Sequence, residues 1–415
     1  MRLKQVRVII AVITLTLALS SSGWSQEVSV KPGDVINKNN YQKAADLIPP
    51  AILEHIKNGD FQMPITDYVA PTYTKGFQRA TEKGKGKVKL DEKGNLLNWE
   101  GGCPFPDLDL KDPKAALKMA WNRDKCLYHG DDHGVDKYRL TMVNPQGKER
   151  HLIGLEESWR TVFFTGRTEI PPMPTIKTEP EQVRLKQLTS LDAPYDVKGI
   201  IHLKVRYEDE TKEDDIWMYL PTIRRVRRMV GAQRSEAFGG TDCTYDDITL
   251  YMGRCLENEY KIAGEQKILT TISVLPPYKP AGWARKGVFE EEPYMVTDCY
   301  ILEAKPVDPN YIYSKRVIWI DKKTWQSAVS QVYDKKGTLW KTGYNNTAKI
   351  KTGIGDYMSY GIGFWWYDHQ ASRGTVYEQF PFTLCGGEMQ YAKVSTNLDY
   401  NKYFTQAFMK ERGER

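Results

Sequence analysis

The sequence predicts a mainly β protein of the α+β class, in which an antiparallel sheet carries a few covering helices. Residues 197–208 alternate apolar and polar side chains, which is the period of a strand with one solvated face. Short turns rich in Asp and Gly, such as 334–337, separate successive apolar runs, as in antiparallel hairpins. A helical period is clear only in residues 40–57 and 112–123.

The two helical segments carry their own start and stop signals. In residues 40–57, Ile52, Leu53 and Ile56 share one face, although Pro49 and Pro50 interrupt the segment because proline removes a helical hydrogen bond. In residues 112–123, Asp112 can cap the helix and the proline after it suits the first turn. We therefore expect one interrupted helix and one short helix.

The remaining periodic segments predict hairpins and consecutive strands. The proline-rich residues 170–180 are expected to form a linker or a sheet edge. Hairpins are expected at 87–98 and 138–153, and strands at 197–208, 215–220, 317–320, 327–333 and 338–342.

The N-terminal 25 residues resemble a secretory signal peptide. Arg2, Lys4 and Arg7 precede an apolar run over residues 8–19, followed by small residues, and this run is too short to span a bilayer. Cleavage is expected after Ser20 or Ser25, and no cysteine lies nearby to carry a lipid anchor. We therefore expect a periplasmic protein without a lipid anchor.

Composition and charge exclude several classes of protein. The chain has 415 residues, of which 40% are hydrophobic and 27% charged, so it is neither disordered nor a multispanning membrane protein. The net charge of +6 falls to 6 − 3 = +3 when the leader's three basic residues are removed. A nucleic-acid partner is therefore not expected.

Export would allow the six cysteines to form disulfides. The pairing with the shortest loops joins Cys103 to Cys126 and Cys243 to Cys255 and leaves Cys299 for Cys385, although fifteen pairings are possible for six cysteines. No Cys-x-x-Cys motif supports a redox or zinc site.

The sequence contains little that predicts catalysis. His129 and His133, with two aspartates between them, are weak candidates for a metal site, because flanking glycines favour a loop over a helix. No nucleophile elbow and no phosphate-binding loop occurs. We expect no cofactor and no enzymatic activity, and an acid/base pair of carboxylates stays open.

Four arginines follow the predicted strand at 215–220. They could bind a partner protein or lipid head groups, since guanidinium offers a planar set of donors. Alternatively, they form a solvated strand, which is the usual role of a charge run. These residues are Arg224, Arg225, Arg227 and Arg228.

Motifs in residues 186–345 resemble the outer-membrane lipoprotein-sorting (LolA-like) superfamily. They are 215–221 with the arginine run, 240–242 with 245–247, and then 299–303, 313–321 and 333–337 in the same order. The whole chain is similar to the longer branch of that superfamily, which consists of exported bacterial proteins of unknown function. The resemblance divides the chain into a signal peptide (1–25), an N-terminal extension (26–185), a LolA-like sheet core (186–345) and a C-terminal extension (346–415) that packs on the same barrel.

The resemblance implies an unclosed antiparallel β-barrel whose helices cover its mouth and whose apolar interior accepts acyl chains. It further implies a non-enzymatic periplasmic carrier or accessory protein for a lipid or other hydrophobic cargo, working with an inner-membrane exporter of the RND type or an outer-membrane protein. The candidate cavity residues are Ile201, Leu203, Val205, Trp217, Tyr219 and Trp319.

Two other hypotheses remain open from the residues. One is an exported metal-assisted hydrolase that acts on a lipid or glycan through His129 and His133. The other is an adaptor that holds an exporter through the arginine run. The aromatic stretch at residues 365–367 is expected to be a strand, a lid or a rim that meets a membrane or partner.

Overall fold

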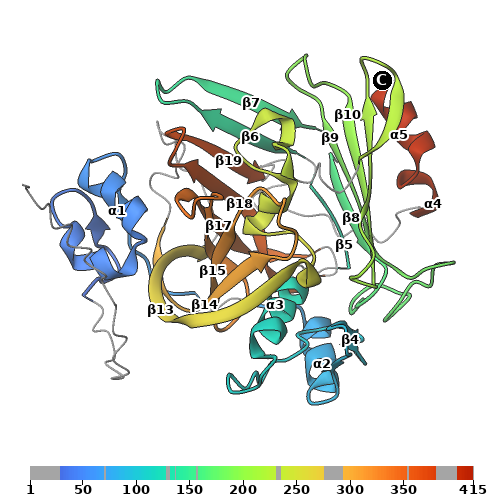
Figure 1. The fold of residues 1–415 in the computed structure, drawn as a ribbon, viewed down its shortest axis with the longest axis horizontal. Coiled ribbons are helices and arrows are strands. Elements are labelled where there is room, and N and C mark those ends of the chain that lie inside the picture. Colours follow the sequence, from blue (N-terminus) through green and yellow to red (C-terminus); the bar gives the residue numbers. More distant parts are fainter. Residues whose placement is uncertain are drawn as a thin grey trace, which may run out of the picture.

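The computed structural model describes residues 29–69, 72–127, 131–135, 137–155, 158–229, 235–274, 293–352, 355–379 and 400–414. Two large antiparallel sheets dominate these ranges (Figure 1). The small sheet has the strand order β12-β11-β10-β9-β8-β5, and the large sheet has the order β13-β14-β15-β16-β17-β18-β19-β6-β7. The predicted signal peptide and Cys385 lie outside the described residues.

The strands of the small sheet are β5 (Asp132–Val135), β8 (Trp159–Phe163), β9 (Val183–Leu191), β10 (Ile200–Tyr207), β11 (Asp215–Leu220) and β12 (Arg225–Met229). Those of the large sheet are β6 (Tyr138–Val143), β7 (Glu149–Gly154), β13 (Asn258–Val274), β14 (Met295–Pro306), β15 (Lys315–Asp321), β16 (Ser327–Tyr333), β17 (Leu339–Lys351), β18 (Tyr357–Asp368) and β19 (Arg373–Gln379).

The large sheet curls without closing into a complete barrel. Its long strand β13 pairs with β14 over most of its length, and its end meets β17 in a short parallel pairing at Thr271 and Asn346. The other neighbouring strands pair antiparallel. The predicted mainly β fold with an unclosed antiparallel sheet is therefore confirmed.

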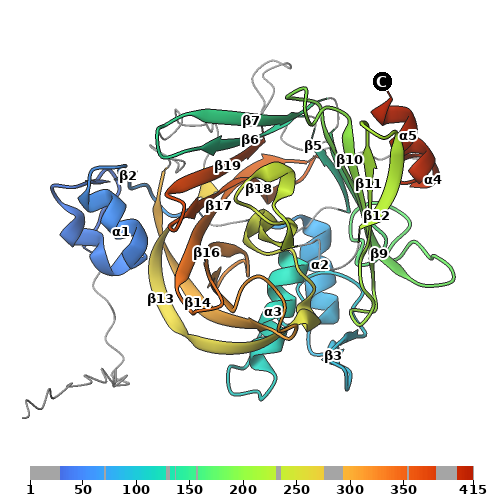
Figure 2. The same cartoon turned by 45° about the horizontal axis from the view of Figure 1, so that its top comes forward.

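The concave side of the large sheet is filled by the protein's own residues. Figure 2 shows α3 (Ala115–Cys126) and the segment that precedes β13 within the curl. This inner segment, residues 238–257, contains η3 (Phe238–Gly240), η4 (Tyr245–Leu250) and η5 (Cys255–Glu257). Phe238 and Leu250 pack against Phe364 and Trp366 of β18. The resemblance implied an apolar hollow at this place, and the described residues correct that expectation.

A buried carboxylate holds the inner segment against the large sheet. Asp247 accepts a hydrogen bond from the Arg316 guanidinium at 2.6 Å and another from the Tyr313 hydroxyl at 2.6 Å. The Trp366 indole donates to the backbone carbonyl of Asp247 at 2.9 Å. Burial opposes ionisation of Asp247, but the nearby Arg316 outweighs it, so the pKa of this carboxyl is lowered.

The N-terminal part of the chain packs on the convex side of the large sheet. Ile52, Leu53 and Ile56 of α1 (Pro50–Lys57) are buried in one cluster with Trp365, and the His55 ring lies 4.5 Å from the Tyr367 ring. η1 (Tyr41–Leu47) precedes α1, and the two flank Pro49 as the sequence predicts. Of the three alternatives for residues 365–367, a strand, a lid or a rim, the structure shows a strand: they are part of β18, with Trp365 and Trp366 pointing to opposite sides.

The outer face of the small sheet is covered by the C-terminal helices α4 (Tyr400–Tyr403) and α5 (Gln406–Gly413). Phe404 and Met409 are buried with Ile201, Leu203 and Tyr219 of the sheet. Figure 1 shows these helices, in red, on the side of the small sheet that faces away from the large one. One face of the small sheet is therefore closed by helices, and the other faces the inner segment.

Smaller elements complete the described chain, and some were not predicted. The expected hairpin at 87–98 is β3 (Lys89–Leu90) with β4 (Leu96–Leu97), and the one at 138–153 is β6 with β7. α2 (Lys75–Gly84) was not predicted because Phe77 is its one large buried apolar residue. β1 (Val35–Ile36) pairs with β2 (Met63–Pro64).

Both sheets take strands from more than one of the predicted segments. β5 and β8, from the predicted N-terminal extension, join the small sheet, while β18, β19, β6 and β7 extend the large sheet beyond β17. Within the described ranges, the helices are all too short or too polar to span a bilayer.

We expect Asp247→Ala to destabilise the protein by about 3–5 kcal/mol, because it leaves the Arg316 guanidinium buried without its carboxylate. Urea unfolding followed by tryptophan fluorescence measures this change. The matched control is Asp112→Ala, which removes a partly exposed ion pair with Lys118 and should cost less than about 1 kcal/mol. Equal losses in the two variants would contradict the role assigned to Asp247.

Candidate functional site

A cavity of about 450 Å³ lies between the small sheet and the inner segment. Strands β8 to β10 and Ile216 of β11 form one wall, and the inner segment from Phe238 to Glu257 forms the opposite wall. Val307 and Asp308, which follow β14, line it as well. This volume is within the range of small-molecule sites, so the cavity is the candidate functional site.

Strand alternation decides which residues of β10 reach the cavity. His202, Lys204 and Arg206 line it, whereas Ile201 and Leu203 are buried on the opposite face beneath α5. Successive side chains of a strand point to opposite faces, and the apolar side chains of the C-terminal segment cover one of these faces. The polar residues are therefore left facing the inner segment.

The structure places the six predicted cavity residues outside this cavity. Ile201, Leu203, Val205, Trp217 and Tyr219 belong to the cluster under α4 and α5. Trp319 lies in the cluster on the convex side of the large sheet, where its indole donates to Gln266 at 2.9 Å. The alternation in residues 197–208 was predicted, but the face that lines the cavity is the polar one.

One end of the cavity is aromatic. Trp159 of β8 is in register with Thr189 of β9, which is in register with His202 of β10. From the other wall, the Phe238 ring lies 5.8 Å from the His202 ring, and the Tyr245 hydroxyl is hydrogen-bonded to Nε2 of His202 at 2.7 Å. Burial lowers the pKa of His202 to about 4, so the imidazole is neutral at pH 7.

The other end of the cavity is charged. The Arg206 guanidinium donates to both Asp214 oxygens, at 2.7 Å from Nη2 and 3.0 Å from Nε. Burial opposes ionisation of Asp214, but Arg206 and Lys204 outweigh it and hold the pKa of its carboxyl well below the usual range. Burial and the nearby Arg206 lower the pKa of Lys204 to about 8.

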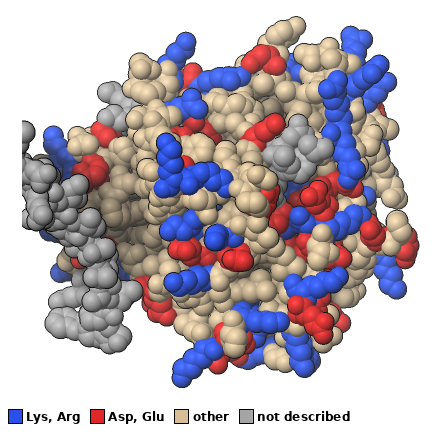
Figure 3. Space-filling model, viewed as in Figure 1, with Lys and Arg blue, Asp and Glu red and all other residues tan. Residues whose placement is uncertain are grey.

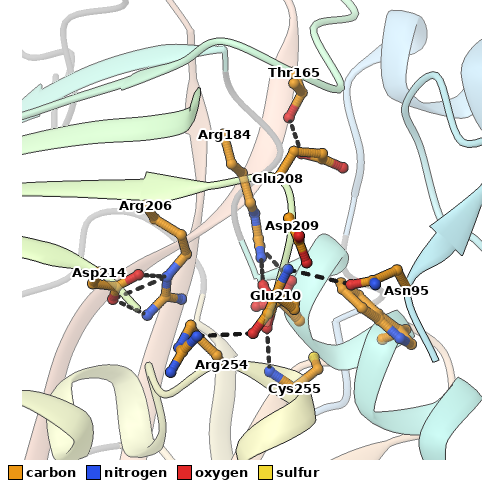
Figure 4. A network of polar contacts seen from close by, with 12 residues as sticks. Asn95, Thr165, Arg184, Arg206, Glu208, Asp209, Glu210, Asp214, Arg254 and Cys255 are labelled. Atoms are coloured by element: carbon orange, nitrogen blue, oxygen red, sulfur yellow. Dashed lines mark hydrogen bonds and ion pairs between the residues drawn. The ribbon is translucent and has the colours of Figure 1, made fainter. Parts of the chain in front are cut away.

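A buried network of charges joins the cavity to α3 (Figure 4). Arg184 of β9 donates to Asp124 of α3 and, at 3.0 Å, to Glu210 in the loop between β10 and β11. Glu210 also accepts from the backbone of Cys255 in the inner segment at 2.8 Å. This network fixes the position of the loop that carries Asp214, so the charged end of the cavity is rigidly built.

The four arginines considered as a binding surface for a partner or for lipid head groups are exposed at the edge strand β12 and in the turn before it. Register places Arg227 opposite Met218 and Arg228 opposite Trp217. Arg228 pairs with Asp215, while Arg225 and Arg227 lie on the same face of the sheet as His202. Figure 3 shows basic side chains gathered at the upper right, over this edge of the small sheet.

The two candidate metal ligands are not brought into this cavity. His133 is buried in β5 near the Tyr360 ring, and burial lowers its pKa to about 4. His129 lies outside the described residues. Within the described part of the chain, no three His, Cys, Asp or Glu side chains are grouped as metal ligands would be.

The five described cysteines are free and buried. Cys255 donates its thiol to the carbonyl of Ala120 at 3.7 Å, while Cys243 belongs to the cluster on β18, so the predicted Cys243–Cys255 bond is not formed. Cys103 and Cys126 lie in the same cluster around α3 as free thiols, so the predicted Cys103–Cys126 bond is not formed either. Burial raises the pKa of Cys126 well above its usual value, which keeps this thiol protonated.

Together, the fold and the cavity define an antiparallel β protein that holds a small-molecule-sized space between two sheets. The chain belongs to the family described as "Protein of unknown function (DUF1329)", which matches residues 35–409. The resemblance noted in the motifs is consistent with this assignment, because it too led to a family of unknown function.

The chain is also similar to one further bacterial protein in sequence and to two solved structures. An uncharacterized protein of Pseudomonas aeruginosa is 26% identical over 335 residues, which cover 75% of this chain and 69% of the relative. The structure is similar to that of a DUF1329 family protein from Desulfovibrio piger, with a TM-score of 0.49, 20% identity and coverage of 71% of this chain and 98% of that one. A LolA superfamily protein from Nitrosomonas europaea has a TM-score of 0.41 and 13% identity, with the same coverage.

We expect stability to fall as the pH decreases from about 6.5 to about 4. His202, His133 and His369 have folded pKa values lowered to about 4, so the unfolded chain binds more protons in this window. His202→Gln should reduce the dependence of the free energy of unfolding on pH by about 1 kcal/mol per pH unit near pH 5. Urea unfolding at several pH values checks this, with the partly exposed His151→Gln as control. An unchanged slope in His202→Gln would contradict the assigned burial.

Proposed function

We propose that this protein is an exported, non-enzymatic carrier or accessory protein that holds an amphipathic, lipid-like molecule between its two sheets. The observation that carries the proposal is the cavity of about 450 Å³ with one aromatic and one charged end. A ligand with an apolar part and a polar part matches such a lining at both ends.

The aromatic end supplies the shelter that an apolar chain needs in an aqueous compartment. Each CH₂ group withdrawn from water contributes about 0.8 kcal/mol, so burying a 12-carbon chain stabilises the complex by roughly 10 kcal/mol. Trp159, Phe238 and Ile248 offer apolar surface for it. A second void of about 20 Å³ lies beyond Trp159 and Ile248, which both cavities share.

The proposed periplasmic location and the proposed partner are inferred mainly from the sequence. A leader of the secretory type at residues 1–25 favours the periplasm. The exposed arginines at the β12 edge favour a partner protein with an acidic surface. The resemblance to lipoprotein-sorting proteins favours transfer of the cargo to or from such a partner, for which a membrane exporter of the RND type is the candidate.

We expect Ile216→Trp to reduce occupancy of the cavity by at least tenfold, because Ile216 lines the cavity and a larger ring fills the space. The measurement is native mass spectrometry of gently purified protein, followed by extraction of the bound molecule into organic solvent. Ile223→Trp is the matched control, since Ile223 is exposed in the turn between β11 and β12. Full occupancy in Ile216→Trp would place the cargo elsewhere.

Reversing the arginine run should abolish binding to the partner without emptying the cavity. The variant replaces Arg224, Arg225, Arg227 and Arg228 by Glu, and the measurement is cross-linking in cells followed by purification of the cross-linked membrane protein. Exposed arginines act mainly on association with an oppositely charged surface.

A control variant separates position from net charge. It applies the same charge reversal to four exposed lysines and should retain the partner. If both variants lose the partner to the same extent, the arginine run is not the docking surface. The control residues are Lys83, Lys85, Lys87 and Lys89.

A further inference from the structure

We propose that the amphipathic ligand carries an acidic head group, a carboxylate or a phosphate, and that Lys204 binds this head group. The inference rests on the proposed carrier function and names the class of its cargo. The observation behind it is an ammonium group that faces the cavity and whose nearest carboxylate among the described residues, that of Asp214, lies 3.6 Å away, beyond hydrogen-bond distance.

Lys204 lines the cavity from the middle of β10, between His202 and Arg206. Its side chain is 16% exposed, and among the described residues its ammonium has one charged contact, Asp214 at 3.6 Å. That distance exceeds a hydrogen bond. An ammonium carries three donors, and leaving them unpaired in a largely buried place is costly.

The carboxylates near Lys204 already have other partners. Asp214 accepts two hydrogen bonds from Arg206. Glu257 accepts from the Arg254 side chain at 2.8 Å, and Asp246 accepts from the Tyr311 hydroxyl at 2.8 Å. Each of these carboxylates is therefore oriented toward a donor other than Lys204, which leaves the Lys204 ammonium able to bind an acceptor that a ligand brings into the cavity.

The lining of the cavity is formally acidic before a ligand enters. Lys204, Arg206 and Arg254 oppose five carboxylates, which gives 3 − 5 = −2, so the wall as a whole does not attract an anion. The carboxylates are those of Glu213, Asp214, Asp246, Glu257 and Asp308. Recognition then depends on the local contact, and within the described residues the Lys204 ammonium is the cation on this wall that lacks a hydrogen-bonded acceptor. A single acidic head group suits this contact better than a cationic one.

The order of residues along β10 gives the ligand one orientation. His202 stands at the aromatic end with Phe238 and Tyr245, and Arg206 stands at the charged end with Asp214. Lys204 lies two residues from each, on the same face of the strand. The head group therefore sits at Lys204, and the apolar chain extends toward Trp159 and Ile248.

The test compares four amphipaths that share one chain and differ in head group. Dodecanoate, dodecyl phosphate, dodecanol and dodecyltrimethylammonium are titrated, below their micelle concentrations, into delipidated mature protein by isothermal calorimetry at pH 7. The wild type should bind the two acids more tightly than the alcohol and the cation. Lys204→Met should weaken both acids by about 10- to 100-fold, the range of one charge-assisted hydrogen bond, and leave dodecanol unchanged.

Two control variants make the result specific. Lys186→Met removes a lysine from the same sheet on its opposite face, in register with Val205, and should leave all four affinities unchanged. Lys204→Arg keeps the charge and should keep the preference for acids. Thermal unfolding of each variant confirms that it is folded.

The dependence on pH gives an independent readout. Because the pKa of Lys204 is lowered to about 8, raising the pH from 7 to 9 should weaken dodecanoate by up to about tenfold as the ammonium loses its proton. Carboxylates and guanidinium groups ordinarily keep their charge between about pH 7 and 9. Burial lowers the pKa of His202 to about 4 and raises the pKa of Tyr245, so both side chains stay neutral in this range. The other charged groups of the lining are Glu213, Asp214, Asp246, Glu257, Asp308, Arg206 and Arg254. Lys204→Met should lose this dependence.

The outcomes separate the two proposals. If the wild type binds the four amphipaths equally, or if Lys204→Met weakens dodecanol as much as dodecanoate, the head-group assignment is wrong while the carrier proposal stands. If folded wild type binds none of the four and yields no extractable molecule, both proposals fail.

Discussion

The structure depends on how buried charges are satisfied between its two sheets. Asp247 draws hydrogen bonds from Arg316, Tyr313 and the backbone of Thr244, and thereby holds the inner segment inside the curl of the large sheet. The backbone there is unfavourable, since Thr249 and Leu250 have φ of 50° and 70°. Arg316 also donates to the carbonyl of Leu250 at 2.6 Å, so one ionic cluster maintains both the position and the conformation of this wall.

The same requirement explains why a cavity remains beside the inner segment. The cavity face of β10 carries His202, Lys204 and Arg206, and such side chains cannot pack against apolar residues without losing their hydration. Arg206 is satisfied by Asp214, and His202 by Tyr245. The sheet and the inner segment therefore meet through a few specific polar contacts, and the space between those contacts is the candidate site.

Local patterns were sufficient for much of the secondary structure but not for the site. The alternation in residues 197–208, the Asp-Gly turn at 334–337 and the proline between η1 and α1 each depend on neighbouring residues, and the structure contains them. The assignment of faces depends on distant residues. Ile201 and Leu203 read equally well as cavity lining or as core, and α5, some 200 residues later in the chain, covers them. The sequence did contain a signal for the cavity face. His202, Lys204 and Arg206 alternate along one face of the strand, and three ionisable side chains on one face need polar partners.

The sequence by itself determined that the chain forms antiparallel strands with few helices, because hydrophobic period and turn chemistry are local properties. It also contains the motifs in residues 186–345 that resemble the LolA-like superfamily. The tertiary structure alone decided that the curl of the large sheet is filled and that the cavity lies beside it, lined by the polar face of β10. The physical reason is that burial is shared between segments far apart in the chain, and no local pattern records which of two faces a distant segment will cover.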